Sequence, residues 1–308
     1  MLPGELCDHT CDALVCTFET FAVGSTVLAG LGGSHTVLAL WLVGTWPFCM
    51  ATWRMYHTGV MTLPEFNGPN EGLALLYLTQ TVTACVGQAA LWGAGPWHVR
   101  LPGDVQLSVR PAHVYAASGI AMALVDTLGH LYAGLSAAKA QGRTRRRAMA
   151  QLSPYMGLVA CLLAWSAWSP TDVAGTQPYV LLLGFGMQFA YLMARLILAH
   201  LCDEHTRLIR AMWRVLVPLP LAVGNAAYAR FVAADGQPLV DENALLWFNC
   251  VYATFMYVRF AMNVTHDITA WLGIYCFSLH RRTPGWKLEQ ENGTANGVND
   301  HTDKSKRF

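Results

Sequence analysis

Acidic side chains stand at helical spacing near the start of this chain. Gly4, Asp8 and Asp12 are four residues apart, and an apolar run follows them directly. A spacing of four places all three on one stripe of a helix. Two carboxylates one turn apart are costly beside hydrocarbon, and a shared divalent cation relieves that cost because hard cations prefer oxygen ligands. The pattern therefore predicts a cation site on a helix, where Gly4 lets a substrate approach the backbone.

His9 adds a titratable base to the same turn. It lies beside Asp8 and one turn after Glu5, and a carboxylate four residues earlier can orient an imidazole and make it more basic. Two simpler interpretations stay open from the residues alone. The acids also suit a helix N-terminus, where they complement the helix dipole, and His9 also suits the interfacial end of a helix.

The residues from Gly4 to Asp12 resemble part of a family signature. Their Gly-x3-Asp-x3-Asp spacing is similar to the second half of the CDP-alcohol phosphotransferase signature, Asp-Gly-x2-Ala-Arg-x8-Gly-x3-Asp-x3-Asp. The local text, Gly-Glu-Leu-Cys-Asp-His-Thr-Cys-Asp, is closer still to the Gly-Glu-Leu-x-Asp-His-x-Cys-Asp of eukaryotic choline and ethanolamine phosphotransferases. The first half of the signature is absent from this sequence, so we expect an N-terminally incomplete member of that family.

The resemblance implies an activity and a role for each residue of the motif. It implies transfer of phosphocholine or phosphoethanolamine from CDP-choline or CDP-ethanolamine to diacylglycerol, with release of CMP, in the endoplasmic reticulum or Golgi membrane. Asp8 and Asp12 are the expected ligands of Mg²⁺ or Mn²⁺, which screens charge on the leaving nucleotide. His9 is the expected general base, with Asp12 as its rival, and Gly4 and Glu5 are expected to contact substrate.

A polar loop supplies one more candidate. The stretch 66–72 reads Phe-Asn-Gly-Pro-Asn-Glu-Gly and is similar to a Phe-x-Gly-Pro-x-Glu-Gly stretch of fungal and plant members. Glu71 enters the next apolar run, so it is a candidate for the substrate chamber. A turn followed by a helix N-terminal acid explains the same residues equally well.

Composition places the chain in a membrane. Of 308 residues, 54% are hydrophobic and 13% charged, whereas soluble domains carry roughly a quarter charged residues. The nine cysteines are scattered, an odd number without metal-type pairing, which predicts reduced thiols and no disulfide framework. Cys7, Cys11 and Cys16 lie near the acids, but cysteine is also an ordinary small residue of membrane helices, and that interpretation is favoured over a metal cluster.

Long apolar runs predict an all-α, polytopic membrane protein. About eight spans are long enough, each of about 20 residues, where the full family has about ten. They are expected at 9–31, 33–53, 72–93, 112–136, 153–169, 178–200, 211–231 and 243–262. The stretch 264–279 suits an interfacial helix or a helix extension. We expect one transmembrane domain over residues 1–280 and a disordered cytosolic tail over 281–308.

The distribution of charge orients this topology. Basic residues collect in the loops on the side of the chain's start: Arg54, Lys139, Arg143, Arg145, Arg146, Arg147, Arg207 and Arg210. The positive-inside rule then places Asp8 and Asp12 in the cytosol, on the side of a nucleotide substrate. The run 143–147 is interpreted as a topology and anionic-lipid patch, so no nucleic-acid partner is expected.

A rival class of function stays open from the sequence. Asp126 and His130 are four residues apart within a predicted span, and such a pair suits a proton relay in a transporter or a contact between helices. A truncated, catalytically inactive relative is the other alternative. The residues do not decide between choline and ethanolamine, and a homodimer is left open.

Overall fold

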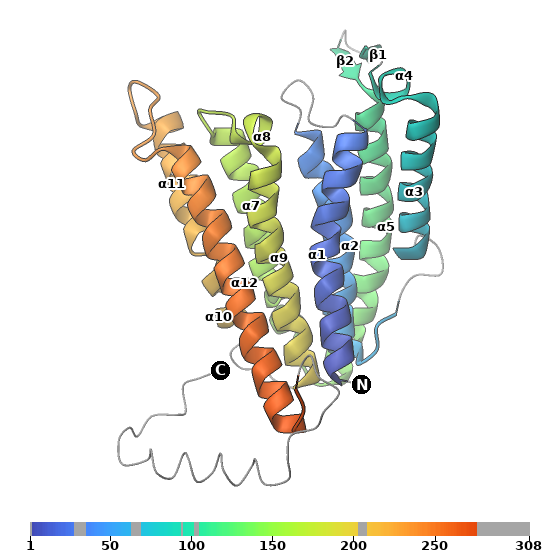
Figure 1. The fold of residues 1–308 in the computed structure, drawn as a ribbon, viewed down its shortest axis with the longest axis vertical. Helices are drawn as coiled ribbons and strands as arrows, with labels where there is room; N and C mark the ends of the chain where they lie inside the picture. The colour runs from blue at the N-terminus through green and yellow to red at the C-terminus, as the bar shows by residue number, and fades with distance from the viewer. Residues whose placement is uncertain are drawn as a thin grey trace. The chain divides into compact units, whose positions relative to one another are not determined.

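Long apolar helices make up most of the chain in this computed structural model (Figure 1), which describes residues 2–27, 35–62, 69–93, 95–101, 105–202 and 208–275. The elements are α1 (Leu2–Thr26), α2 (Thr36–Thr58), α3 (Pro69–Val86), α4 (Gln88–Trp92), β1 (Trp97–Leu101), β2 (Val105–Val109), α5 (Pro111–Ala140), α6 (Arg145–Ala150), α7 (Ser153–Trp168), α8 (Val173–Thr176), α9 (Pro178–Leu201), α10 (Leu208–Trp213), the 3₁₀ turn η1 (Arg214–Leu216), α11 (Pro218–Phe231) and α12 (Glu242–Leu272). The all-α prediction is confirmed.

The chain forms two units. The first is Met1–Tyr257 and the second is Val258–Phe308. By length and composition, α2, α5, α9 and α12 can each cross a membrane. The other predicted spans overlap α1, α3, α7 and the α10–α11 segment, so the count of eight stays a prediction. The predicted tail, 281–308, lies outside the described residues.

Helix α9 is the core of the first unit. It packs against α1, α2, α7 and α10, while α2 lies along α5 (Figure 1). Phe189 of α9 meets the rings of Trp41 and Phe48 on α2 and of Tyr155 on α7. These edge-on and tilted ring contacts are the geometry that aromatic pairs prefer. The helix that carries the acidic motif, α1, is therefore held against the most buried part of the fold.

Helix α1 runs in the opposite direction to α2, α5 and α9 in the first unit (Figure 1). The start of α1 lies at the same end as the ends of α2, α5 and α9, at the lower side of Figure 1. Bonds between side chains and backbone fix that end: the Gln141 amide donates to the His57 carbonyl at 2.6 Å, and the Trp53 indole donates to the Ala148 carbonyl at 3.0 Å. The basic segment α6 is thereby attached to the end of α2.

The predicted span 211–231 is not one continuous helix. Pro218 has no N–H to give to the carbonyl four residues earlier, and the chain passes through η1 before α11 begins. Tyr252 donates instead to the Arg214 carbonyl at 2.8 Å, and Gln188 donates to the Val215 carbonyl at 3.1 Å. Side chains of α12 and α9 thus satisfy the carbonyls that the break releases, as a membrane interior requires.

A β-hairpin between α4 and α5 was not expected from the sequence. Strands β1 and β2 pair antiparallel, with Trp97 opposite Val109. The alternating residues of 97–101 and 105–109 carry the appropriate signal, with Pro102 and Gly103 between them in the sequence. These runs of five residues are short compared with the long apolar spans, and they were not predicted to be strands.

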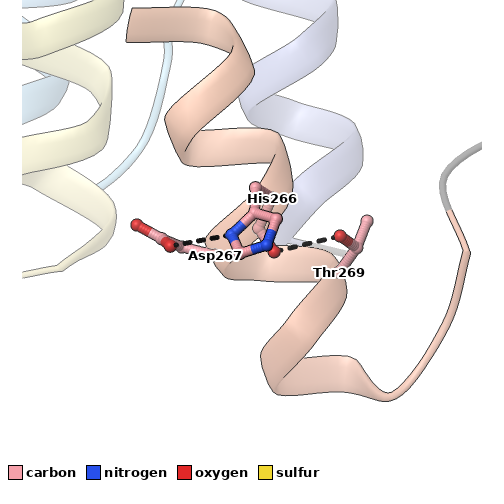
Figure 2. A network of polar contacts seen from close by, with 3 residues as sticks. All are labelled: His266, Asp267 and Thr269. Carbon is pink, nitrogen blue, oxygen red and sulfur yellow. Dashed lines mark hydrogen bonds and ion pairs between the residues drawn. The ribbon is translucent and has the colours of Figure 1, made fainter. Parts of the chain in front are cut away.

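In the second unit, the stretch from 264 begins as a continuation of helix α12. The helix runs to Leu272 and is followed by Gly273, whose φ of 66° is readily adopted by glycine. Figure 2 shows the polar residues of this extension. His266 Nδ1 lies 3.4 Å from Asp267 Oδ1, and Thr269 Oγ1 donates to the His266 carbonyl at 3.0 Å. Of the two alternatives, the structure favours a helix extension over the described residues.

Candidate functional site

Asp8, His9 and Asp12 form one cluster on α1. One ligand atom from each of the three side chains can be chosen so that all lie within 4.8 Å of one another. The two carboxylates are exposed, and the side chain of His9 is half-buried. His9 Nδ1 lies 3.7 Å from Asp12 Oδ2, too far for a hydrogen bond. Because this buried Nδ1 atom has no hydrogen-bond partner among the described residues, the cluster has room to bind a shared cation.

The donor set fits a hard divalent cation. Two carboxylates supply the oxygen ligands that Mg²⁺ and Mn²⁺ prefer. The four-residue spacing brings the acids together within a single helix, so no distant contact is needed to assemble this part of the site. The predicted ligands are therefore adjacent, whereas the cation itself stays a prediction.

The other candidate residues occupy different surroundings. Gly4 is exposed, with open space where a Cβ atom would stand. Glu5 is half-buried. Among the described residues, no hydrogen bond or ion pair joins it to His9, so its expected role in orienting His9 stays a prediction. Glu71 is exposed in the first turn of α3, which suits the simpler interpretation of a helix N-terminal acid.

Thr17 of α1 packs against the two neighbouring helices, α2 and α9. The Trp41 indole of α2 donates to Thr17 Oγ1 at 3.1 Å, in a buried contact. On the other side, Gly186 of α9 stands so near that a Cβ atom there would lie 2.6 Å from Thr17 Cγ2 and 2.9 Å from Thr17 Cβ. Thr17 is little more than one turn beyond Asp12, so this packing sets the position of the cluster. Sequence reasoning missed this anchor because its partners are far apart in the chain.

Replacing Gly186 with alanine is expected to displace α1 and lower activity together with stability. Overpacking of this kind costs about 1–3 kcal/mol. The measurement is thermal unfolding of the detergent-purified chain. Gly224→Ala is the matched control, because nothing lies within 4 Å of a Cβ atom there. Adding Thr17→Ala to Gly186→Ala is expected to recover part of the loss, and an unchanged Gly186→Ala protein would contradict the anchor.

Asp126 and His130 do lie together within α5. His130 is buried, and both Asp126 and Arg54 of α2 act on it electrostatically. This arrangement gathers three ionisable groups inside two candidate spans. Arg54 lies on α2 and the other two groups on α5, the two helices that lie alongside each other in the first unit.

These features define a class of protein: an integral membrane protein with an acidic cluster at the end of one helix. Its most informative likenesses are two proteins of Arabidopsis thaliana. Choline/ethanolaminephosphotransferase 2 is 39% identical over 91% of this chain and 71% of its own length. Choline/ethanolaminephosphotransferase 1 is 37% identical over the same shares. A yeast relative, choline/ethanolaminephosphotransferase 1 of Saccharomyces cerevisiae, is 25% identical over 90% of this chain and 70% of its length.

The chain belongs to the CDP-alcohol phosphotransferase family, in the branch of the choline/ethanolamine phosphotransferases. Its class is thus that of the transferases of phosphate-containing groups. No family model matches the chain, so the assignment rests on whole-chain similarity to these relatives. The family predicted from residues 4–12 is confirmed over nine-tenths of the chain.

Proposed function

We propose that this chain transfers phosphocholine or phosphoethanolamine from the CDP-alcohol to the hydroxyl of diacylglycerol, with Asp8, His9 and Asp12 at the reacting centre. The observation that carries the proposal is the clustering of these three side chains on α1. The names of the two Arabidopsis relatives support the substrates. We place the reaction in the endoplasmic reticulum or Golgi membrane.

The carboxylates and the imidazole divide the chemistry between them. Asp8 and Asp12 would hold Mg²⁺ or Mn²⁺, which when bound neutralises charge on the diphosphate. His9 accepts the proton of the lipid hydroxyl at Nε2, while its Nδ1 faces Asp12. The hydroxyl oxygen forms a bond to the β-phosphorus, and the bond from that phosphorus to the bridging oxygen breaks, so that CMP leaves with the electron pair.

Charge supports a cytosolic orientation for the site. The guanidinium of Arg143 lies over the Tyr56 ring, 5.5 Å from its centroid, at the end of α2. Arg145, Arg146 and Arg147 follow in α6. Hydrogen bonds join this segment to the end of α2, and the end of α2 lies at the same end of the first unit as the start of α1 (Figure 1). Positive residues favour the cytosolic side, where CDP-alcohols would reach Asp8 and Asp12.

Transfer by the purified chain tests the proposal directly. The chain is produced in a host that lacks choline and ethanolamine phosphotransferase activity and is supplied with diacylglycerol, Mg²⁺ and either CDP-choline or CDP-ethanolamine. We expect phospholipid and CMP in equal amounts, with the ratio of the two rates giving head-group preference. Absence of both products, from a folded protein, would overturn the proposal. A solute flux into vesicles without transfer would favour the transporter alternative.

His9→Gln is expected to lower kcat by about 10²–10⁴-fold while leaving the KM for CDP-choline nearly unchanged, because general-base catalysis contributes that much to a rate. Initial rates over a range of CDP-choline concentrations separate the two parameters. His35→Gln is the control, since His35 lies at the N-cap of α2 and outside the cluster. Full activity of His9→Gln would assign the base to Asp12.

A further inference from the structure

A cavity of about 390 Å³ lies between the ends of α7 and α11. This volume is within the usual range of sites for small ligands. The residues that line it come from 167–170, 229–230 and 233–236. Both helices end at the upper side of Figure 1, whereas α1 begins at the lower side. The cavity is therefore separate from the acidic cluster of α1, and the proposed transfer does not use it.

Hydrogen bonds fix both walls of the cavity. On the α7 side, the Ser169 hydroxyl donates to Glu242 Oε2 at 2.7 Å. On the α11 side, the Ala233 N–H donates to the Tyr228 carbonyl at 2.9 Å, which closes the end of the helix. Each wall is thus held by contacts of its own, and the cavity is a formed part of the fold.

The cavity carries charges of both signs. Arg230 and Asp235 line it, and neither belongs to an ion pair among the described residues. Asp235 Oδ1 accepts a bond from the Gln237 N–H at 3.0 Å, which holds the turn after α11. A guanidinium binds phosphate oxygens well, whereas a carboxylate in the same cavity disfavours a ligand that is only negative. The charges therefore favour a ligand that has a phosphate and a cationic group.

The ends of the two helices suit the cationic group. The Trp168 indole lines the cavity and meets the Phe231 ring edge-on, with the ring centroids 5.5 Å apart. Aromatic rings attract quaternary ammonium groups. Trp168 ends α7 and Phe231 ends α11, and the C-terminal end of a helix carries a partial negative charge that favours a cation. An ammonium group can thus lie beside a phosphate in this cavity.

Apolar side chains stand next to the cavity. Phe231 and Val232, which lie in the chain between lining residues, are 66% and 69% exposed. Exposed apolar and aromatic side chains at the end of a membrane helix are typical of the interface between lipid and water. This surrounding favours a lipid over a ligand that is free in water.

We propose that the cavity binds the zwitterionic head group of a membrane phospholipid. The guanidinium of Arg230 binds the phosphate, and the ammonium group lies against Trp168. The lipid belongs to the leaflet on the far side of the membrane from the acidic cluster. The inference goes beyond the proposed function, because this lipid is not a reactant and binds whether or not transfer occurs.

Native mass spectrometry of the purified full chain tests binding without an activity assay. Dioleoylphosphatidylcholine is titrated into the protein in detergent, and the number of lipids retained at each concentration is counted. We expect one tightly retained lipid whose Kd rises at least about tenfold in Arg230→Gln, as the loss of a hydrogen-bonded charge predicts. Trp168→Leu is expected to weaken the same lipid. Arg210→Gln is the control, because it removes the same charge from an exposed site on α10, outside the cavity. Titration curves of Arg230→Gln and Trp168→Leu that match that of Arg210→Gln would overturn the site.

Two further ligands decide what the cavity recognises. Glycerophosphocholine has the same charged groups without acyl chains, and dioleoylphosphatidylglycerol has the chains and the phosphate without the ammonium group. The unaltered chain is expected to bind each at least about tenfold more weakly than dioleoylphosphatidylcholine. Equal affinity for glycerophosphocholine would overturn the assignment to a lipid, and equal affinity for phosphatidylglycerol would overturn the selection of a zwitterion. Absence of transfer by the purified chain, with these binding results intact, would contradict the proposed function alone.

Discussion

Asp12→Asn is expected to reduce the rate of transfer by more than about a hundredfold, because it removes a proposed cation ligand. Replacing even a residue that only hydrogen-bonds to a metal ligand lowers metal affinity or activity by about 10–100-fold. The Asp12 carboxylate also faces His9, with Oδ2 3.7 Å from Nδ1. Losing its charge therefore affects both the cation and the base. The measurement is the rate of transfer from CDP-choline over a wide range of Mg²⁺ concentrations, and we expect Asp8→Asn to behave alike.

Asp235→Asn provides the comparison for that experiment. Asp235 is an exposed acid in the turn that follows α11, where its carboxylate accepts a bond from the Gln237 N–H. It is expected to keep the rate and the Mg²⁺ dependence of the unaltered chain. If Asp12→Asn gave the same curve as Asp235→Asn, the α1 cluster would lose its place at the reacting centre.

The second large effect concerns a carboxylate buried far along the chain. Glu242 begins α12 and is 0% exposed. It accepts hydrogen bonds from the Trp165 indole at 3.1 Å, the Ser169 hydroxyl at 2.7 Å, and both the N–H and the hydroxyl of Thr171 at 3.1 and 2.5 Å. These bonds connect the start of α12 to the end of α7 and the segment before α8. The helix dipole of α12 favours the negative charge.

Glu242→Ala is expected to destabilise the first unit by about 3–5 kcal/mol, since the buried Trp165 indole and the part-buried donors of Ser169 and Thr171 lose their acceptor at once. Glu242→Gln keeps one acceptor oxygen and should cost less. Thermal unfolding in detergent measures the difference. Glu71→Gln changes a glutamate that also lies in the first turn of a helix but at an exposed site, and should stay within about 0.5 kcal/mol. A Glu242→Ala protein as stable as Glu71→Gln would show that the bonds contribute little.

What could be predicted from the sequence was local. The spacing of Gly4, Asp8 and Asp12 is sufficient to place them on one stripe, because helix geometry depends only on neighbouring residues. The same nine residues identified the family that whole-chain similarity confirms. Long apolar runs likewise predicted helices, because their length exceeds that of any strand.

What could not be predicted depended on contacts between distant residues. Nothing near Thr17 indicates that Trp41 donates to it or that Gly186 must be small. The donors around Glu242 lie more than 70 positions away. Pro218 did offer a signal for the break in 211–231, since proline interrupts helices. Mean hydropathy alone does not reveal this break, because an interrupted helix and a continuous helix have the same apolar composition.

The burial of α9 has a consequence for how the protein is made. Of the four candidate spans α9 is the most apolar, and 78% of its apolar window is buried, against 22% for α5. A helix enclosed by α1, α2, α7 and α10 has little need of a hydrocarbon surface in the finished fold. Insertion from the translocation machinery, however, is decided by the hydrophobicity of each segment, and helices associate afterwards. The apolar surface of α9 thus serves first its entry into lipid and later its packing.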